Sequence, residues 1–408
     1  MGEKLRSIAK SATFWALIVY CLMAAALWFA TGGKIASINS DLDLYNHFVV
    51  ARFPDHVSEL SKAVELGSPR IEALEHFGWT PTPFYSLIFL LPVWLFGSNF
   101  LLWLEGLALG VLTIWCAAKV VEKLGVGIPA ALKFLVVLAF PLNFNFLVDS
   151  VGVSTMSVAA AFVMAAVVVE SRLLRAALLT FAAMTRVNYL FFAFAFLLSG
   201  LMFRPKGWMN CLIDAVPSLV VYIIFYKLYY STYPGGGLNY VLMASFQGLD
   251  YAIPESSRIL ARLSGSPSDA LSYRMNLGNL PALLVNLDSL AYVFNLSALK
   301  LSVTLGLVHE KLFQSDWGFY LAKVWRTAYF SFAMMPGFYA SLLLLFARGL
   351  GAWEKTGYAW VVLYLVMNSL LIGDPRYLMG VYLVLLIALA RIISIATSFS
   401  RGALRGVA

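Results

Sequence analysis

Continuous apolar segments, separated by short charged turns, run along most of the chain. Because they are continuously apolar rather than alternating, they favour helices over the strands of an outer-membrane barrel. A helix crossing a bilayer needs about 20 apolar residues, and we predict ten crossings. The predicted segments are 13–33, 100–118, 130–147, 154–169, a hairpin of two short helices over 176–203, 209–230, 326–346, 357–372 and 379–398.

Two polar stretches interrupt this pattern, and we predict that both lie outside the membrane on the same side. The first outer loop covers 34–99 and contains a short apolar run at 83–97, which we interpret as an interfacial or re-entrant helix because it includes Pro92. The second, 231–325, is predicted to be a large outer loop insert with interfacial helices. A twelve-crossing variant with a second span near 281–307 stays open. No internal repeat is evident, so 1–408 is predicted to be a single transmembrane domain.

The composition supports a membrane protein. Hydrophobic residues make up 61% of the chain and charged residues only 12%, whereas an ordinary soluble domain carries about 25% charged residues. The predicted fold class is therefore an all-α polytopic membrane protein with 10–12 transmembrane helices. The cysteines Cys21, Cys116 and Cys211 lie in or at the ends of apolar segments and indicate neither a disulfide framework nor a zinc site.

The positive charges define the topology. The net charge is +8, and basic residues collect in the loops that the positive-inside rule assigns to the cytoplasm. These residues are Lys119, Lys123, Arg172, Arg175, Arg204, Lys206, Arg348, Lys355, Arg401 and Arg405. We therefore predict an inner-membrane protein with both termini in the cytoplasm. A basic run with interleaved aromatic residues, the pattern typical of nucleic-acid binding, is missing from the sequence.

The potentially reactive residues fall mainly on the outer side. All four histidines and most acidic residues lie in predicted outer segments. The cytoplasmic loops are too short for a nucleotide-binding domain, and the sequence contains no P-loop. Any chemistry is therefore expected at the periplasmic or exterior membrane boundary.

The first candidate site is the sequence Ser-Asp-Leu-Asp-Leu-Tyr-Asn-His, directly beyond the first predicted helix. Asp41, followed by Asp43 and Tyr45, could act as a general base there, because partial burial raises the pKa of a carboxyl group. The alternative is a solvated loop start in which Asp41 caps a helix.

Other candidates lie further along the chain. Trp79 and Tyr85 belong to an aromatic and proline-rich segment with His76, which suits either a sugar-binding wall or an interfacial anchor. Arg186 and Arg376 are each predicted at an outer helix end. There an arginine could bind a phosphate, or it could contact lipid headgroups or a neighbouring acid.

Two further pairs complete the set of candidates. Tyr377 follows Arg376, and His309 precedes Glu310 in the large outer loop. The His309–Glu310 pair could serve in acid–base chemistry or substrate orientation, or it could be a solvated surface. The residues that follow it exclude an HExxH zinc motif.

The order of these motifs resembles the GT-C superfamily of membrane glycosyltransferases, in particular bacterial polyprenol-phosphate-mannose-dependent mannosyltransferases. The resemblance rests on short motifs between residues 13 and 398: the acidic motif at Asp41, the aromatic–proline segment from Trp79, the Phe140-Pro141 pair followed by Asp149, the Thr-Arg-Val-Asn turn at Arg186, and the Arg376-Tyr377 pair. In the Thr-Arg-Val-Asn turn, Val187 replaces a proline, and the 231–325 insert has no counterpart.

This resemblance implies an inverting transfer of a sugar from a polyprenyl-phosphate donor to a glycolipid or glycan acceptor at the outer leaflet. Asp41 would be the general base, while Arg376, Arg186 and Tyr377 would bind the donor phosphate. The residues implied in substrate binding are Asp43, Tyr45, His76, Trp79, Tyr85, His309 and Glu310. No cofactor is implied; a divalent metal is possible, with Asp43 and Asp149 as ligands, but is not indicated.

Two other interpretations remain. An O-antigen or capsular polysaccharide polymerase would use lipid-pyrophosphate-linked repeat units and arginines, without an acidic base after the first helix. A lipid-linked glycan flippase or transporter would carry charged residues within its membrane segments.

Overall fold

A computed structural model of residues 1–408 describes most of the chain in detail. The described residues are 2–30, 32–33, 99–185, 189–230, 256–265, 285–305, 324–325, 328–370 and 378–405. Within these ranges the chain is helical and contains no strand.

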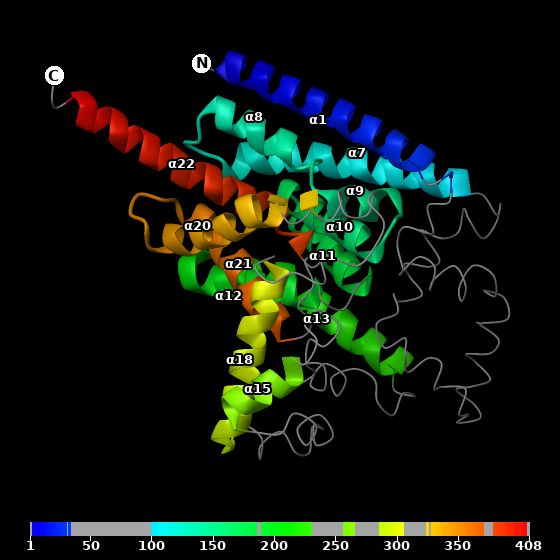
Figure 1. The fold of residues 1–408 in the computed structure, drawn as a ribbon, viewed down its shortest axis with the longest axis vertical. Helices are drawn as coiled ribbons and strands as arrows, with labels where there is room; N and C mark the ends of the chain where they lie inside the picture. Colours follow the sequence, from blue (N-terminus) through cyan, green and yellow to red (C-terminus); the bar gives the residue numbers. More distant parts are fainter. Residues whose placement is uncertain are drawn as a thin grey trace.

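Thirteen α-helices make up this part of the chain (Figure 1). Their bounds are α1 Gly2–Ala30, α7 Asn99–Leu124, α8 Ala130–Ala139, α9 Phe144–Val151, α10 Thr155–Val168, α11 Arg172–Thr185, α12 Leu190–Phe203, α13 Trp208–Tyr230, α15 Ser256–Ser264, α18 Leu287–Thr304, α20 Met335–Phe346, α21 Ala352–Ser369 and α22 Tyr382–Arg405. A 3₁₀ turn, Pro205–Gly207, precedes α13, and a π-helical turn, Phe330–Met334, leads into α20.

Two of the described helices are long and apolar enough to cross a membrane. They are the stretches Ser11–Ala30 of α1 and Phe100–Leu124 of α7. A third span is possible if the bent pair α8 and α9 counts as one. Several shorter apolar helices, in α10, α12, α13, α20 and α22, accompany them. These findings support association with a membrane, while the predicted number of ten crossings is not established by them.

The helices pack as one bundle in which α10 is buried among its neighbours. Helix α10 packs against α7 and α11, α12 packs against α13 and α21, and α20 packs against α22. Helix α1 covers α7 and α8 along one edge of the bundle (Figure 1). Most of α10 is inaccessible to solvent, including Val158, Ala159 and Val163. Its continuously apolar sequence is explained by this position, because a helix that is apolar all round must be buried.

The predicted segment 130–147 is not a straight crossing. It is divided into α8 and α9, which meet at an angle of 52°, and α9 continues to Val151. Pro141 lies in the break, where its ring and missing N–H group interrupt the helix. The side chain of Asn143 then accepts a hydrogen bond from the Phe146 amide and caps α9. The bend therefore follows from local sequence.

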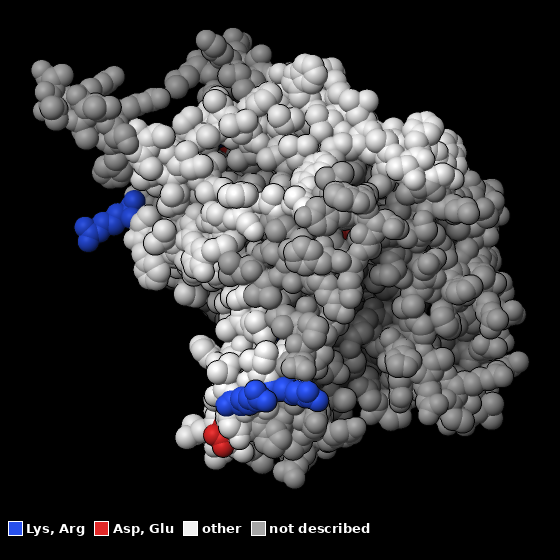
Figure 2. All heavy atoms as spheres, in the orientation of Figure 1, with Lys and Arg blue, Asp and Glu red and all other residues white. Residues whose placement is uncertain are grey.

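The segment 231–325 contains two described helices, α15 and α18, which pack against each other. Figure 1 shows α18 running across the direction of α1 and α7 rather than along it. Helix α18 is not among the candidate spans. Exposed charges include Arg258, Arg262 and Asp288, and Figure 2 shows charged atoms of the described residues at this end of the molecule. The interfacial position predicted for helices of this loop stays a prediction.

Candidate functional site

The residues predicted to carry the chemistry lie outside the described part of the chain. They are Asp41, Asp43, Tyr45, His76, Trp79, Tyr85, Arg186, His309, Glu310, Arg376 and Tyr377. The segments that flank three of them are described: α1 ends shortly before Asp41, α11 and α12 flank Arg186, and α22 follows Arg376. The region around the candidate site is therefore described by the helix ends nearest to these positions in the sequence.

A polar cluster on the short helix α9 is the centre of this region. Asn145 and Asp149 are four residues apart and so share one face of the helix. Both are buried, with Asp149 only 3% exposed. The Asn145 side-chain amide donates a hydrogen bond to the Tyr382 hydroxyl at 3.4 Å, which joins α9 to the start of α22. The buried Asp149 carboxyl group therefore lies one helical turn along α9 from this contact.

The junction between α9 and α10 is tight and strained. The Ser154 amide donates to the Asp149 carbonyl oxygen at 2.8 Å, and the Val153 amide donates to the Ser150 carbonyl oxygen at 3.1 Å. This is the Schellman pattern, whose left-handed residue is usually glycine. Here that residue is Val153, with φ of 49°, a conformation that is costly for a β-branched side chain. Such strain is concentrated at functional sites in many proteins.

The N-terminus of α10 is fixed to this junction by serine side chains. The Ser154 hydroxyl accepts from the Ser157 amide and caps α10. The Ser157 hydroxyl in turn donates to the carbonyl oxygens of Asp149 and Ser154, at 2.8 and 2.9 Å. The backbone around Asp149 is therefore held from two directions, so its side chain has little freedom to relocate.

Helix α1 reaches the same cluster through Tyr20. Its hydroxyl lies 3.2 Å from the Gly106 carbonyl oxygen and 3.0 Å from the Ser150 hydroxyl. Gly106 allows α7 to approach α9 closely, because a Cβ atom there would lie 2.4 Å from the Val151 carbonyl oxygen. The first helix, which leads to Asp41, is thus packed directly on the helix that carries Asp149.

The starts of α12 and α22 meet beside the cluster. The Tyr189 hydroxyl donates to the Met156 carbonyl oxygen at 3.2 Å, which joins the start of α12 to the start of α10. A Cβ atom on Gly380 would lie 3.1 Å from the Tyr189 ring and 2.5 Å from the Phe192 ring. Tyr189, three residues after Arg186, and Gly380, four residues after Arg376, are therefore neighbours in the fold.

A second carboxyl group lies on α7 next to this region. Glu105 precedes Gly106, and its Oε2 atom is buried with no hydrogen-bond partner among the described residues. Within the same residues there is no group of three histidine, cysteine or acidic side chains that could hold a metal ion.

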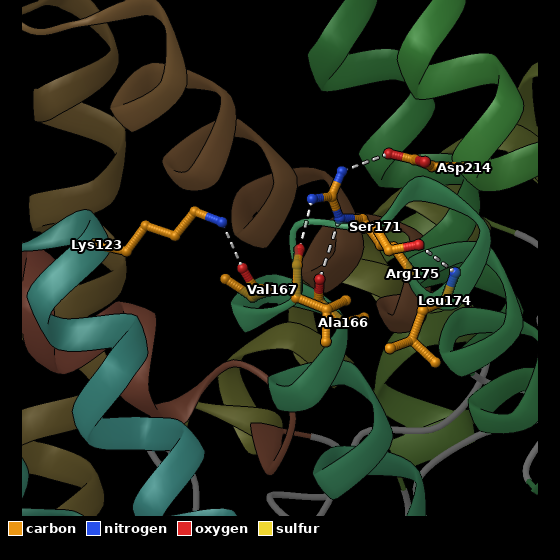
Figure 3. A network of polar contacts seen from close by, with 8 residues as sticks. Lys123, Ala166, Val167, Ser171, Leu174, Arg175 and Asp214 are labelled. Atoms are coloured by element: carbon orange, nitrogen blue, oxygen red, sulfur yellow. Dashed lines mark hydrogen bonds and ion pairs between the residues drawn. The ribbon is translucent and has the colours of Figure 1, made fainter.

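A different polar network is located at the opposite end of α10 (Figure 3). Arg175 of α11 donates to the carbonyl oxygens of Ala166 and Val169, at 3.1 and 2.7 Å, while Lys123 of α7 donates to the Val167 carbonyl oxygen at 2.8 Å. These carbonyl groups lie at the C-terminus of α10, where the helix dipole is negative and its carbonyls have no partner within the helix.

Asp214 of α13 completes this second network. Its Oδ2 atom lies 2.9 Å from an Arg175 nitrogen, and its side chain is only 2% exposed. The ion pair compensates the charge of Arg175 inside the bundle. The arrangement has a sufficient structural role, which is to terminate α10 and join α7, α11 and α13 to it.

From the sequence, Arg175 indicates only the topology, and the predicted site residues do not include Asn145, Tyr382 or Tyr20. The spacing of Asn145 and Asp149 after Pro141 was the available signal for the α9 cluster. Tyr20 and Tyr382 gave no such signal, because an isolated tyrosine within an apolar segment is unremarkable.

No family model, no curated protein and no solved structure matches this chain. The function must therefore be argued from its own residues.

Proposed function

We propose that the protein is a GT-C-type glycosyltransferase of about ten membrane crossings, which transfers a sugar from a polyprenyl-phosphate donor to a glycolipid or glycan acceptor. The protein lies in the inner membrane, and its site faces the periplasm or the cell exterior. Asp41 removes a proton from the acceptor hydroxyl, which attacks the anomeric carbon, and polyprenyl phosphate leaves. Arg376 and Arg186 offset the charge that develops on the phosphate.

The main support is the contact between Tyr189 and Gly380. Arg186 precedes Tyr189 by three residues and Arg376 precedes Gly380 by four. An extended chain spans at most about 3.6 Å per residue, so three and four residues can reach at most about 11 and 14 Å. A shared phosphate site is compatible with that limit.

The helix directions provide further support. Helices α10, α12 and α22 all begin in this region, as the contacts of Tyr189 with Met156 and Gly380 show. Helix N-termini carry partial positive charge and unpaired N–H groups, so they favour an anion. Together with the two arginines they would favour a lipid-linked phosphate.

The test is a transfer assay with the purified full chain in proteoliposomes. The probe is a polyprenyl-phosphate mannose with radiolabelled sugar, and the readout is label moved to extracted membrane glycolipids. Asp41→Asn is expected to lower the rate by about 10²–10⁴-fold, as for loss of a general base. Arg376→Gln is expected to lower it by about 10²–10³-fold. Lys119→Gln, an exposed position on α7, is the control. Full activity of Asp41→Asn would refute the base assignment.

One observation favours a second candidate, a lipid-linked glycan flippase or transporter. Glu105 lies within the candidate span Phe100–Leu124 and has a buried carboxyl oxygen with no partner among the described residues. Ionisable groups inside membrane segments often mark transport pathways. Movement of the donor lipid between leaflets without sugar transfer, lost in Glu105→Gln, would favour this candidate over the enzyme.

A further inference from the structure

Helix α18 carries a lysine on its buried side. The buried positions of this helix are Ser289, Tyr292, Leu296, Lys300, Val303 and Thr304. Their spacing of mostly three or four residues places them along one side of the helix. Lys300 is only 1% exposed. An ammonium group loses its hydration at such a position, so burial of Lys300 costs free energy whenever the side chain is charged.

This buried side attaches α18 to its neighbours. Helix α18 packs against α15 and α21, and Figure 1 shows the pair α15 and α18 projecting from the bundle beside α21. The opposite side of α18 is open, with Leu287 79% and Phe294 74% exposed. In the described part of the chain, α21 is therefore the main connection between this pair of helices and the bundle.

The acids on these three helices are placed away from the buried lysine. Glu354, the acid on α21, lies 3.8 Å from Arg391. Asp288, the acid on α18, is exposed and about three helical turns from Lys300. The remaining titratable groups on the three helices are Arg258, Arg262, Tyr292, Lys355, Tyr358 and Tyr364. Acids ordinarily titrate near pH 4, and phenols and cations of these types near pH 10 or above.

Lys300 differs from these groups because it changes charge near neutral pH. Burial lowers the pKa of Lys300 from 10.5 to about 7. In a released helix the side chain would be hydrated and would regain its ordinary pKa. The docked state therefore binds fewer protons than the released state between about pH 7 and 10.5. Docking strengthens as the pH rises through this window and is weakest below about pH 7.

We propose that the contact of α18 with α21 is a pH-sensitive switch, in which protonation of Lys300 favours release of α18 from the bundle. Because α18 belongs to the predicted outer loop 231–325, the signal is acidification of the outer compartment. This response is independent of the glycosyltransferase activity. It depends on the proposed membrane orientation only for the compartment whose pH acts on the switch.

The test compares a buried and an exposed position of α18 in the purified full chain, in an uncharged detergent and with the exposed Cys21 replaced by serine. Leu296→Cys places a thiol on the buried side, and Phe294→Cys places one on the open side. Each variant is labelled with a maleimide at pH 8 and at pH 6. The labelling rate at position 296 divided by the rate at position 294 measures the released fraction, because the exposed thiol corrects for the effect of pH on the reaction itself.

Acidification should raise this ratio of labelling rates. With a pKa of about 7 in the docked state and 10.5 in the released state, the docking equilibrium constant falls about tenfold from pH 8 to pH 6. The released fraction, and with it the ratio, should rise by about the same factor while release is rare. An equal ratio at the two pH values, or a lower ratio at pH 6, would overturn the proposal.

Two substitutions of Lys300 test whether this side chain is the sensor. Lys300→Met removes the charge and should make the ratio low and equal at both pH values. Lys300→Arg stays charged at both, because a guanidinium is not deprotonated in proteins, and should keep the ratio high at both. The matched control is Asp288→Asn, which removes an exposed charge from the same helix and should retain the tenfold change. A tenfold change that persisted in Lys300→Met would show that another group is the sensor and would also overturn the proposal.

Discussion

Replacement of Arg175 by methionine should be among the most destabilising single changes in the described bundle. Arg175 holds two terminal carbonyl groups of α10 and pairs with Asp214. The change leaves those carbonyls without their donor and leaves a carboxylate that is 2% exposed without its cation. Removing one partner of a buried ion pair costs about 3–5 kcal/mol. We therefore expect the free energy of unfolding to fall by about that amount.

A double variant separates the effect of losing the Arg175–Asp214 ion pair from the effect of leaving the Asp214 charge unpaired. Arg175→Met/Asp214→Leu replaces both charges with apolar groups, and such replacements are often neutral or stabilising relative to the buried pair. The double variant should therefore be more stable than Arg175→Met alone. The remaining loss should be about 1–3 kcal/mol from the two α10 carbonyls.

Unfolding in mixed micelles with increasing sodium dodecyl sulfate, followed by tryptophan fluorescence, would measure these differences. The control is Lys119→Met, because Lys119 and Glu122 form an exposed pair, with side chains 44% and 43% exposed. Exposed pairs contribute about 0–1 kcal/mol. The reasoning would be refuted if Arg175→Met behaved like this control, or if the double variant were less stable than Arg175→Met.

Three further predictions test other parts of the fold. Gly106→Ala should lower the free energy of unfolding by about 1–3 kcal/mol, because its Cβ would lie 2.4 Å from the α9 backbone. The control is Gly357→Ala, whose Cβ would make only ordinary contacts and should not lower the free energy of unfolding. Burial lowers the pKa of Lys300, on α18 in the predicted outer loop, to about 7. Between about pH 7 and 10.5 the unfolded chain then binds more protons than the folded one, so the free energy of unfolding should rise with pH. Lys300→Met should raise the unfolding midpoint at pH 7. This difference from the unaltered protein should vanish near pH 10.5. The topology can be tested in a background in which the exposed Cys21 is replaced. A maleimide that does not cross membranes should label Leu370→Cys in intact cells but Ser171→Cys only after permeabilisation. The reverse labelling would mean that the proposed topology is inverted.

The sequence predicts much of the helical framework because its apolar segments are long and interrupted by charges. The segment predicted at 154–169 corresponds to α10 Thr155–Val168, and the predicted hairpin over 176–203 corresponds to α11 and α12. The bend at Pro141 was missed because a proline near the end of an apolar run is compatible with either a straight or a broken span. Hydropathy alone does not distinguish these cases.

The candidate site was less predictable than the fold. In the sequence, Asp149 is marked only by a motif that resembles a superfamily loop, whereas the contacts of α9 with α1, α10 and α22 depend on tertiary packing. Gly106 and Gly380 determine how closely these helices approach, and nothing local in the sequence indicates their partners. The roles of Asp41, Arg186 and Arg376 stay predictions.

The direction of α10 links the two ends of the molecule. Its 14 residues span about 21 Å at 1.5 Å per residue, so Ser154 and Arg175 mark two separate layers. The negative C-terminal end is neutralised by Lys123 and Arg175, which donate to its carbonyl groups. The positive N-terminal end is left facing the α9 cluster and Asp149. A phosphate-bearing substrate would therefore be favoured by the helix dipole at the N-terminal end of α10 rather than at its C-terminal end.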